Sequence, residues 1–234
     1  MNIKKHIPNA LTCLNLLSGM IGIYYVIQNG AIYGAYFIFA AAIFDFLDGF
    51  AARLLKVQSA IGKELDSLAD LVTFGVLPAF ILFLMIQNTT TIWFLPYFAF
   101  IIGIQSALRL ANFNIDEEQE DRFIGLPTPA NALFISTLPF LGIKLPWFQG
   151  LLENPYYILA ITFLFAYLLT AALPLLALKF KNFEWSDNKW RYLTLIFSAI
   201  SIMILGIAGI PMAILSYICL SVLNHFLDKN EEKG

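Results

Sequence analysis

Cysteine and charged residues are both scarce in this chain. The two cysteines, Cys13 and Cys219, lie in apolar runs and form no CxxC pair, so we expect small packing residues and no disulfide. Charged residues make up 13% of the 234 residues, and the formal net charge is −2. No basic stripe with interleaved aromatic residues occurs, which argues against nucleic-acid binding.

Long apolar runs make up most of the sequence. Hydrophobic residues are 59% of the chain and the mean hydropathy is +0.75, values typical of a polytopic membrane protein. A membrane-spanning helix needs about 20 mostly apolar residues. The sequence predicts eight such spans, near 8–28, 31–53, 64–86, 91–113, 127–143, 155–178, 191–209 and 211–227. No stretch suits a soluble domain, so we expect residues 1–234 to form one all-α helical bundle in the membrane.

The basic residues predict the orientation of this bundle. With the N-terminus in the cytoplasm, all but one of the 14 lysines and arginines fall on or near the cytoplasmic side, and the exception is Lys144. Such a bias is what the positive-inside rule requires. We therefore expect both termini to be cytoplasmic and the protein to lie in the plasma (inner) membrane.

Four aspartates occur where the second and third spans meet the cytoplasmic interface. Asp45 and Asp48 are spaced i, i+3 and share one face of a helix, which Gly49 and Ala52 extend. On the partner helix the spacing i, i+4, i+8 aligns Gly62, Asp66 and Asp70. A short linker joins the two helices, so we expect an antiparallel hairpin with all four carboxylates in one polar pocket. Small residues between them leave room for a ligand, and Arg53 near the mouth can pair with a carboxylate or a phosphate.

Carboxylates in such a position cost several kcal/mol each unless a cation compensates them. Hard oxygen ligands in pairs favour Mg²⁺ or Mn²⁺, and four carboxylates are enough for two ions that would clamp a diphosphate. The alternative is a set of helix caps and salt bridges.

The pattern Asp48-Gly49-x₂-Ala52-Arg53-x₈-Gly62-x₃-Asp66-x₃-Asp70, with Asp45 ahead of it, resembles the signature of the CDP-alcohol phosphotransferase family. The resemblance implies a six-helix core, about residues 1–180, followed here by C-terminal helices at about 190–228, and it implies a homodimer. It implies that the four aspartates bind two divalent ions and that Asp70 is the base that deprotonates the acceptor alcohol. Gly49, Ala52 and Gly62 would lie against the cytidine, while Arg53 would contact the diphosphate or form a structural pair.

Three further segments resemble the phosphatidylserine synthases of that family. They begin at Ile7-Pro8-Asn9, Arg109-Leu110-Ala111 and Phe123-Ile124-Gly125. In the first segment, polar groups early in the first span either contact the CDP moiety or hydrogen-bond a neighbouring helix; they are Asn9, Thr12 and Asn15. In the second, Arg109 is placed to take a serine carboxylate, with Asn112 close by, although an arginine there also suits a snorkelling anchor.

We therefore expect a metal-dependent membrane transferase of phospholipid biosynthesis, with CDP-diacylglycerol and L-serine as substrates and phosphatidylserine and CMP as products. A glycerol-3-phosphate acceptor would demand more positive charge than Arg109 and Arg122 supply, so serine fits better. The same chemistry with glycerol-3-phosphate, inositol or choline is the nearest alternative. A divalent-cation transporter is the alternative from another class, because carboxylates inside a membrane also mark ion pathways.

Overall fold

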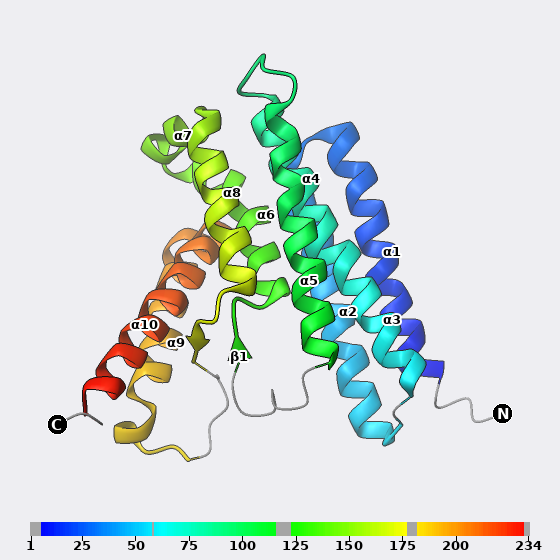
Figure 1. The fold of residues 1–234 in the computed structure, drawn as a ribbon, viewed down its shortest axis with the longest axis vertical. Helices are drawn as coiled ribbons and strands as arrows, with labels where there is room; N and C mark the ends of the chain where they lie inside the picture. Colours follow the sequence, from blue (N-terminus) through cyan, green and yellow to red (C-terminus); the bar gives the residue numbers. More distant parts are fainter. Residues whose placement is uncertain (1–5, 58, 116–122, 177–181, 232–234) are drawn as a thin grey trace.

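The computed structural model describes residues 6–57, 59–115, 123–176 and 182–231, which form a bundle of helices (Figure 1). The α-helices are α1 (His6–Asn29), α2 (Gly34–Leu55), α3 (Ala60–Asp70), α4 (Leu77–Gln87), α5 (Ile101–Ile115), α6 (Thr128–Lys144), α7 (Pro146–Leu152), α8 (Pro155–Thr170), α9 (Trp185–Leu205) and α10 (Ile210–Glu231). Short helical segments are η2 (Ala31–Tyr33), η3 (Leu71–Val76), η4 (Leu95–Phe100) and η5 (Gly206–Gly209). Two-residue strands, β1 (Phe123–Ile124) and β2 (Pro174–Leu175), form one antiparallel pair.

The predicted all-helical membrane architecture is confirmed, but the predicted count of eight spans is not. Five helical segments are long and apolar enough to cross a bilayer, or six if the bent pair α7 and α8 counts as one span. One of the five, Asp187–His225, covers both α9 and α10. The chain breaks there at Gly206, where φ is +62°, and the two helices then pack against each other. Helices α6 and α8 have 17 and 16 residues, which is short for a span.

Two boundaries differ from the predicted ones for local reasons. The sixth span was expected to reach residue 178, but α8 ends at Thr170 and Ala171 is extended. Pro174 follows closely, and a proline disfavours helical geometry in the residue before it. In the fourth span the α-helix begins only at Ile101, after the 3-10 segment η4 that carries Pro96. Both cysteines are free, and they differ from the expected packing residues only in being exposed on the outside of the bundle.

The centre of the bundle is the rod formed by α3, η3 and α4. In its most apolar window 61% of the residues are buried, against 28% in α1 and 22% in the span that contains α2. Its buried face carries large apolar side chains, among them Phe74, Leu77, Ile81, Leu82 and Ile86. The rod is continuous, but η3 is π-helical and follows directly after Asp70. Such single π turns inside α-helices often lie at functional sites.

The rod packs closely against α1. The Thr73 hydroxyl donates to the carbonyl oxygen of Asn15 at 3.2 Å, and a Cβ added at Gly19 would lie 3.0 Å from the Thr73 Cα. Only glycine at position 19 permits this distance. On the other side of η3, a Cβ at Gly75 would lie 2.9 Å from the Cβ of Ser106 on α5. The π turn is therefore held between α1 and α5, which sets the position of the preceding Asp70.

Candidate active site

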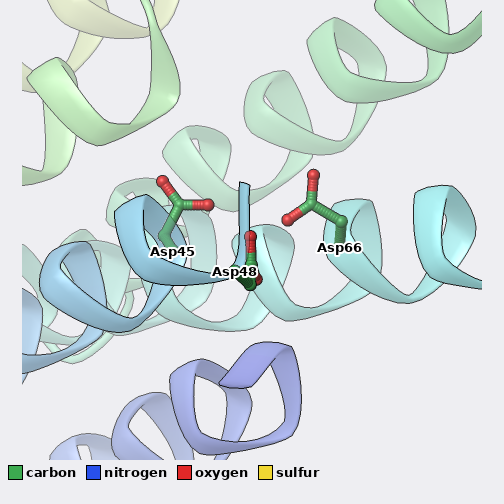
Figure 2. Close-up of side chains that lie close together, drawn as sticks. All are labelled: Asp45, Asp48 and Asp66. Carbon is green, nitrogen blue, oxygen red and sulfur yellow. The ribbon is translucent and has the colours of Figure 1, made fainter. Parts of the chain in front are cut away.

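The turn between α2 and α3 brings together the two halves of the aspartate motif. Lys56 closes α2 in the left-handed conformation with φ 51°, and the Ser59 hydroxyl caps α3 by accepting from the Gly62 amide at 3.0 Å. The helices then run antiparallel with their acidic faces toward one another. Carboxylate oxygens of Asp45, Asp48 and Asp66 all lie within 4.8 Å of one another, converging between α2 and α3 as Figure 2 shows.

These three residues, which we call the metal group, fit a divalent cation. All their donor atoms are carboxylate oxygens, the ligands that Mg²⁺ and Mn²⁺ prefer. Asp48 is buried, and the buried Oδ1 of Asp66 has no hydrogen-bond partner among the described residues. Burying such an oxygen without a partner is costly, so a cation between the carboxylates would satisfy it. The residues therefore could hold a metal ion.

Asp70, the fourth predicted ligand, is not one of the three residues of the metal group, although it interacts electrostatically with each of them. It is one helical turn beyond Asp66, and its Oδ1 accepts a hydrogen bond from Nδ2 of Asn15 at 3.2 Å. Asn15 lies on α1 and is fully buried. The structure thus brings three of the four predicted metal ligands within 4.8 Å of one another and places the predicted base beside them, held by α1.

A pocket of about 590 Å³ opens beside the metal group. Two of the aspartates, Asp48 and Asp66, reach its wall. All six residues predicted to bind CDP line it: Asn9, Thr12, Gly49, Ala52, Arg53 and Gly62. The wall also includes residues that the sequence reasoning did not single out, which are Pro8, Val57, Ser59, Ala60 and Lys63. Lys63 is the second basic residue of the wall, after Arg53. Because it directly follows Gly62 of the motif, the sequence could have indicated its place at the pocket.

Position 62 leaves little room for a side chain, because Ser59 and Asn9 of α1 come close there. A Cβ at Gly62 would lie 2.9 Å from the Ser59 Oγ and 3.0 Å from the Asn9 Oδ1. Gly49 has a different neighbour, since the atoms nearest to a Cβ there belong to the guanidinium of Arg53, beginning at 3.5 Å. Arg53 is exposed and extends over the small residues of α2 at the pocket wall. An anionic group in the pocket would therefore meet a guanidinium that Gly49 leaves room for.

Arg109 lies near Asp70. It lies on α5, is half-buried, and interacts electrostatically with Asp70 and with Tyr217 of α10. Its buried Nε has no hydrogen-bond partner among the described residues. Tyr217, whose hydroxyl donates to the carbonyl oxygen of Leu176 at 3.1 Å, was missed by the sequence reasoning. No local sequence pattern indicates Tyr217, because α10 is far from the aspartate motif in the chain and reaches the site only by tertiary packing.

The predicted neighbour of Arg109, Asn112, lies elsewhere. It is exposed and does not line the pocket. Asn114 is the residue that faces α3: its Nδ2 donates to the Ser67 Oγ at 2.9 Å, and its carbonyl oxygen accepts from the Lys63 Nζ at 3.0 Å. These bonds tie the end of α5 to α3, so they fix Arg109 relative to Asp70.

Comparison with known proteins gives the family of the chain. The family model for CDP-alcohol phosphatidyltransferases matches residues 5–223. The chain therefore belongs to the CDP-alcohol phosphatidyltransferase family. It is similar to the CDP-diacylglycerol–serine O-phosphatidyltransferase of Bacillus subtilis, with 36% identity over 58% of this chain and 76% of that protein.

Further relatives carry the same name. The CDP-diacylglycerol–serine O-phosphatidyltransferase of Mycobacterium leprae is 33% identical over 65% of this chain and 52% of its own length. That of Helicobacter pylori strain J99 is 35% identical over 63% of this chain and 62% of its own length. The matches thus span about three quarters of the Bacillus protein and roughly half to two thirds of the others.

Proposed function

We propose that this membrane protein transfers the phosphatidyl group of CDP-diacylglycerol to L-serine and releases CMP. The single observation that carries the proposal is the pocket, in which all six residues of the expected CDP site share one wall with Asp48 and Asp66. Family membership supports the chemistry. The names of the Bacillus, Mycobacterium and Helicobacter relatives support CDP-diacylglycerol as donor and serine as acceptor. No observation favours the cation-transporter alternative.

We place the donor headgroup in the pocket of about 590 Å³. In this assignment the cytidine lies against the small residues of α2 and α3, which are Gly49, Ala52 and Gly62. The diphosphate lies toward the aspartates, with Arg53 at the wall as an additional positive charge. The metal group and Asp70 together would hold two Mg²⁺ or Mn²⁺ ions. When bound, these ions neutralise the diphosphate and the charge that develops on the departing phosphate.

Asp70 is the proposed base. Its Oδ1 is engaged by Asn15, which leaves Oδ2 for the hydroxyl proton of serine. As that proton moves to Asp70, the serine oxygen forms a bond to the β-phosphorus. The bond between this phosphorus and the oxygen that bridges it to CMP breaks, so CMP leaves and phosphatidylserine is formed.

Arg109 is the proposed site for the serine carboxylate. A half-buried guanidinium with an unpartnered Nε is poorly satisfied without an anion, and it lies within electrostatic reach of Asp70. A carboxylate bound there would bring the serine hydroxyl near the base. Asn112 is exposed, so we assign it no contact with serine in this arrangement.

We further propose eight spans with the site at the cytoplasmic face of the plasma (inner) membrane, in a homodimer. Helix α1 begins and α10 ends at the same end of the bundle, where α2 turns into α3 (Figure 1). An even number of crossings satisfies this placement. Helix α6, which ends at Lys144, ends at the opposite end, consistent with the one exception among the basic residues (Figure 1). The C-terminal helices, about residues 190–228, would supplement a family core of about residues 1–180.

The test is CMP release by the purified protein with CDP-diacylglycerol and Mn²⁺ or Mg²⁺, offering L-serine and glycerol-3-phosphate in parallel. We expect CMP and phosphatidylserine only with serine, and no turnover after chelation of the metal. CMP formation with glycerol-3-phosphate instead would keep the donor chemistry and overturn the acceptor. Metal binding without CMP formation from any alcohol would overturn the transferase.

A further inference from the structure

We infer that α1 contributes two positioning residues to the aspartates, Thr12 for the metal group and Asn15 for the base. The inference rests on the proposed function and assigns these two residues, one helical turn apart, to different parts of the site. Thr12 acts on Asp48, a member of the metal group, whereas Asn15 acts on Asp70, the proposed base. Their effects on the enzyme should therefore differ in kind.

The Thr12 hydroxyl makes a short hydrogen bond to the metal group. Its Oγ1 lies 2.7 Å from the Oδ2 of Asp48 and 3.1 Å from the carbonyl oxygen of Pro8. An ionised carboxylate only accepts, so the hydroxyl donates to Asp48, the shorter and charge-assisted contact. Thr12 and Asp48 are both buried, which gives this bond little competition from water. The other oxygen of Asp48 is left to face a cation.

Asn15 makes the corresponding contact with Asp70. Its amide donates from Nδ2 to Oδ1 of Asp70 at 3.2 Å, and the carbonyl oxygen of its own backbone accepts from Thr73, three residues beyond Asp70. Two bonds therefore join the same residue of α1 to both sides of the junction between α3 and η3. Asn15 orients the carboxylate through its side chain and fixes the π turn through its backbone.

The remaining two aspartates receive no such support from α1. The structure records no hydrogen bond from α1 to Asp45 or Asp66, within the part of the chain that it describes, and Asp66 Oδ1 is unpartnered. The four carboxylates thus divide into two that are oriented by protein donors and two that are free to adjust. Hydrogen-bond partners of metal ligands typically change metal affinity or activity by about 10- to 100-fold when removed.

The experiment compares Thr12→Val and Asn15→Leu, which remove the donors at nearly constant volume. The first readout is Mn²⁺ affinity, measured by electron paramagnetic resonance on the purified full chain without substrate. The second is steady-state CMP release, resolved into kcat and the KM for CDP-diacylglycerol. Thr12→Ser, which keeps the hydroxyl, is the conservative variant, and Asn15→Ala replaces Asn15→Leu where the leucine variant cannot be purified.

Ser18→Ala is the matched control. Ser18 lies on α1 one turn beyond Asn15, and its hydroxyl donates only to the carbonyl oxygen of Leu14 in its own helix, at 2.8 Å. It contacts neither aspartate in the described residues. We expect wild-type Mn²⁺ affinity and kcat from this variant, so that any general effect of removing a hydroxyl from α1 is measured directly.

We expect different signatures from the two substitutions. Thr12→Val should weaken Mn²⁺ binding roughly 10- to 100-fold, with Thr12→Ser close to wild type. Asn15→Leu should weaken Mn²⁺ binding less than Thr12→Val does, and it should lower kcat roughly 10- to 100-fold with the KM for CDP-diacylglycerol unchanged. Equal losses of Mn²⁺ affinity in both variants would overturn the division, because Asn15 would then act on metal binding as Thr12 does. Unchanged Mn²⁺ affinity in Thr12→Val would overturn the role of Thr12.

Failure of the proposed function has a separate signature. A wild-type protein that binds Mn²⁺ but releases no CMP with any alcohol would contradict the transferase, while the contrast in Mn²⁺ affinity between the two variants would still support or contradict the division. With an active wild-type enzyme, wild-type kcat in Asn15→Leu would overturn the role of Asn15 alone.

Discussion

The outer and inner parts of this site are constructed differently. The outer part, the pocket with Asn9, Gly49, Arg53 and Gly62, is made by one helical hairpin and the start of α1, and its wall is open and lined with small residues. The inner part consists of Asp70, Arg109 and Tyr217, which come from α3, α5 and α10. Its polar groups are half-buried, and the Nε of Arg109 has no partner in the described chain.

This difference separates two tasks. A donor headgroup is large, and it needs room and a complementary surface, which small side chains on two adjacent helices provide. An acceptor and a base need fixed geometry, which is obtained by holding a few charged groups from several helices through hydrogen bonds. Substitutions in the inner part should therefore affect turnover and acceptor use, whereas substitutions in the outer part should affect donor binding.

The largest expected effect is that of Asp70→Asn. The amide has no basic oxygen to take the hydroxyl proton, so kcat should fall by about 10²- to 10⁴-fold, while the KM for CDP-diacylglycerol stays near the wild-type value. CMP release at saturating serine measures the change. Full activity in this variant would show that Asp70 is not the base, and a loss of donor binding equal to the loss of kcat would show that the inner and outer parts are not separable.

Arg109→Gln should have the next largest effect, and on the acceptor alone. Removing a charged partner of the serine carboxylate should raise the KM for serine roughly 10- to 100-fold, with the KM for CDP-diacylglycerol unchanged. Arg191→Gln is a suitable control, because Arg191 lies on α9 and bonds to Asp187 and Asn188 of its own helix. If Arg109 is only an anchor at the membrane interface, both variants should give the wild-type KM for serine.

The outer pocket could be predicted from the sequence, whereas most of the inner part could not. Residues of the hairpin are close in the chain, so helical spacing predicts which of them share a face, and the structure places Gly49, Ala52 and Gly62 together on the pocket wall. Tyr217 reaches the site from more than 140 positions beyond Asp70, and no periodic pattern indicates that contact. Asn112 and Asn114 show the limit within one helix, since two positions along α5 separate an exposed side chain from one that faces Ser67.

In the outer part, Gly62→Ala should weaken donor binding. The added methyl group would lie 2.9 Å from the Ser59 Oγ and 3.0 Å from the Asn9 Oδ1, so the pocket wall has to shift. We expect the KM for CDP-diacylglycerol to rise roughly 10-fold with the KM for serine unchanged, about the cost of a modest packing strain. Gly150→Ala is the matched control, because nothing lies within 4 Å of a Cβ there. A rise in the serine KM of Gly62→Ala would break the separation of the two parts.

The smallest expected effect concerns stability at the start of α6, which packs against α10 and against η3 beside the inner part. Asn131 is fully buried there, and neither its Nδ2 nor its Oδ1 has a hydrogen-bond partner among the described residues. Replacing a buried polar group that lacks partners with an apolar one of similar shape is neutral or stabilising, by up to about 1–3 kcal/mol. Asn131→Leu should therefore keep or raise the midpoint of thermal unfolding in detergent.

Thr137→Val provides the contrast within the same helix. The Thr137 hydroxyl donates to the carbonyl oxygen of Leu133 at 2.6 Å, so its removal loses a formed hydrogen bond. The midpoint should fall slightly, by an amount corresponding to about 1 kcal/mol or less. A lower midpoint for Asn131→Leu than for Thr137→Val would show that the Asn131 amide is hydrogen-bonded in solution, for example by a buried water molecule. The start of α6 would then carry a satisfied buried amide beside the inner part, in contrast to the unpartnered Nε of Arg109 among the described residues.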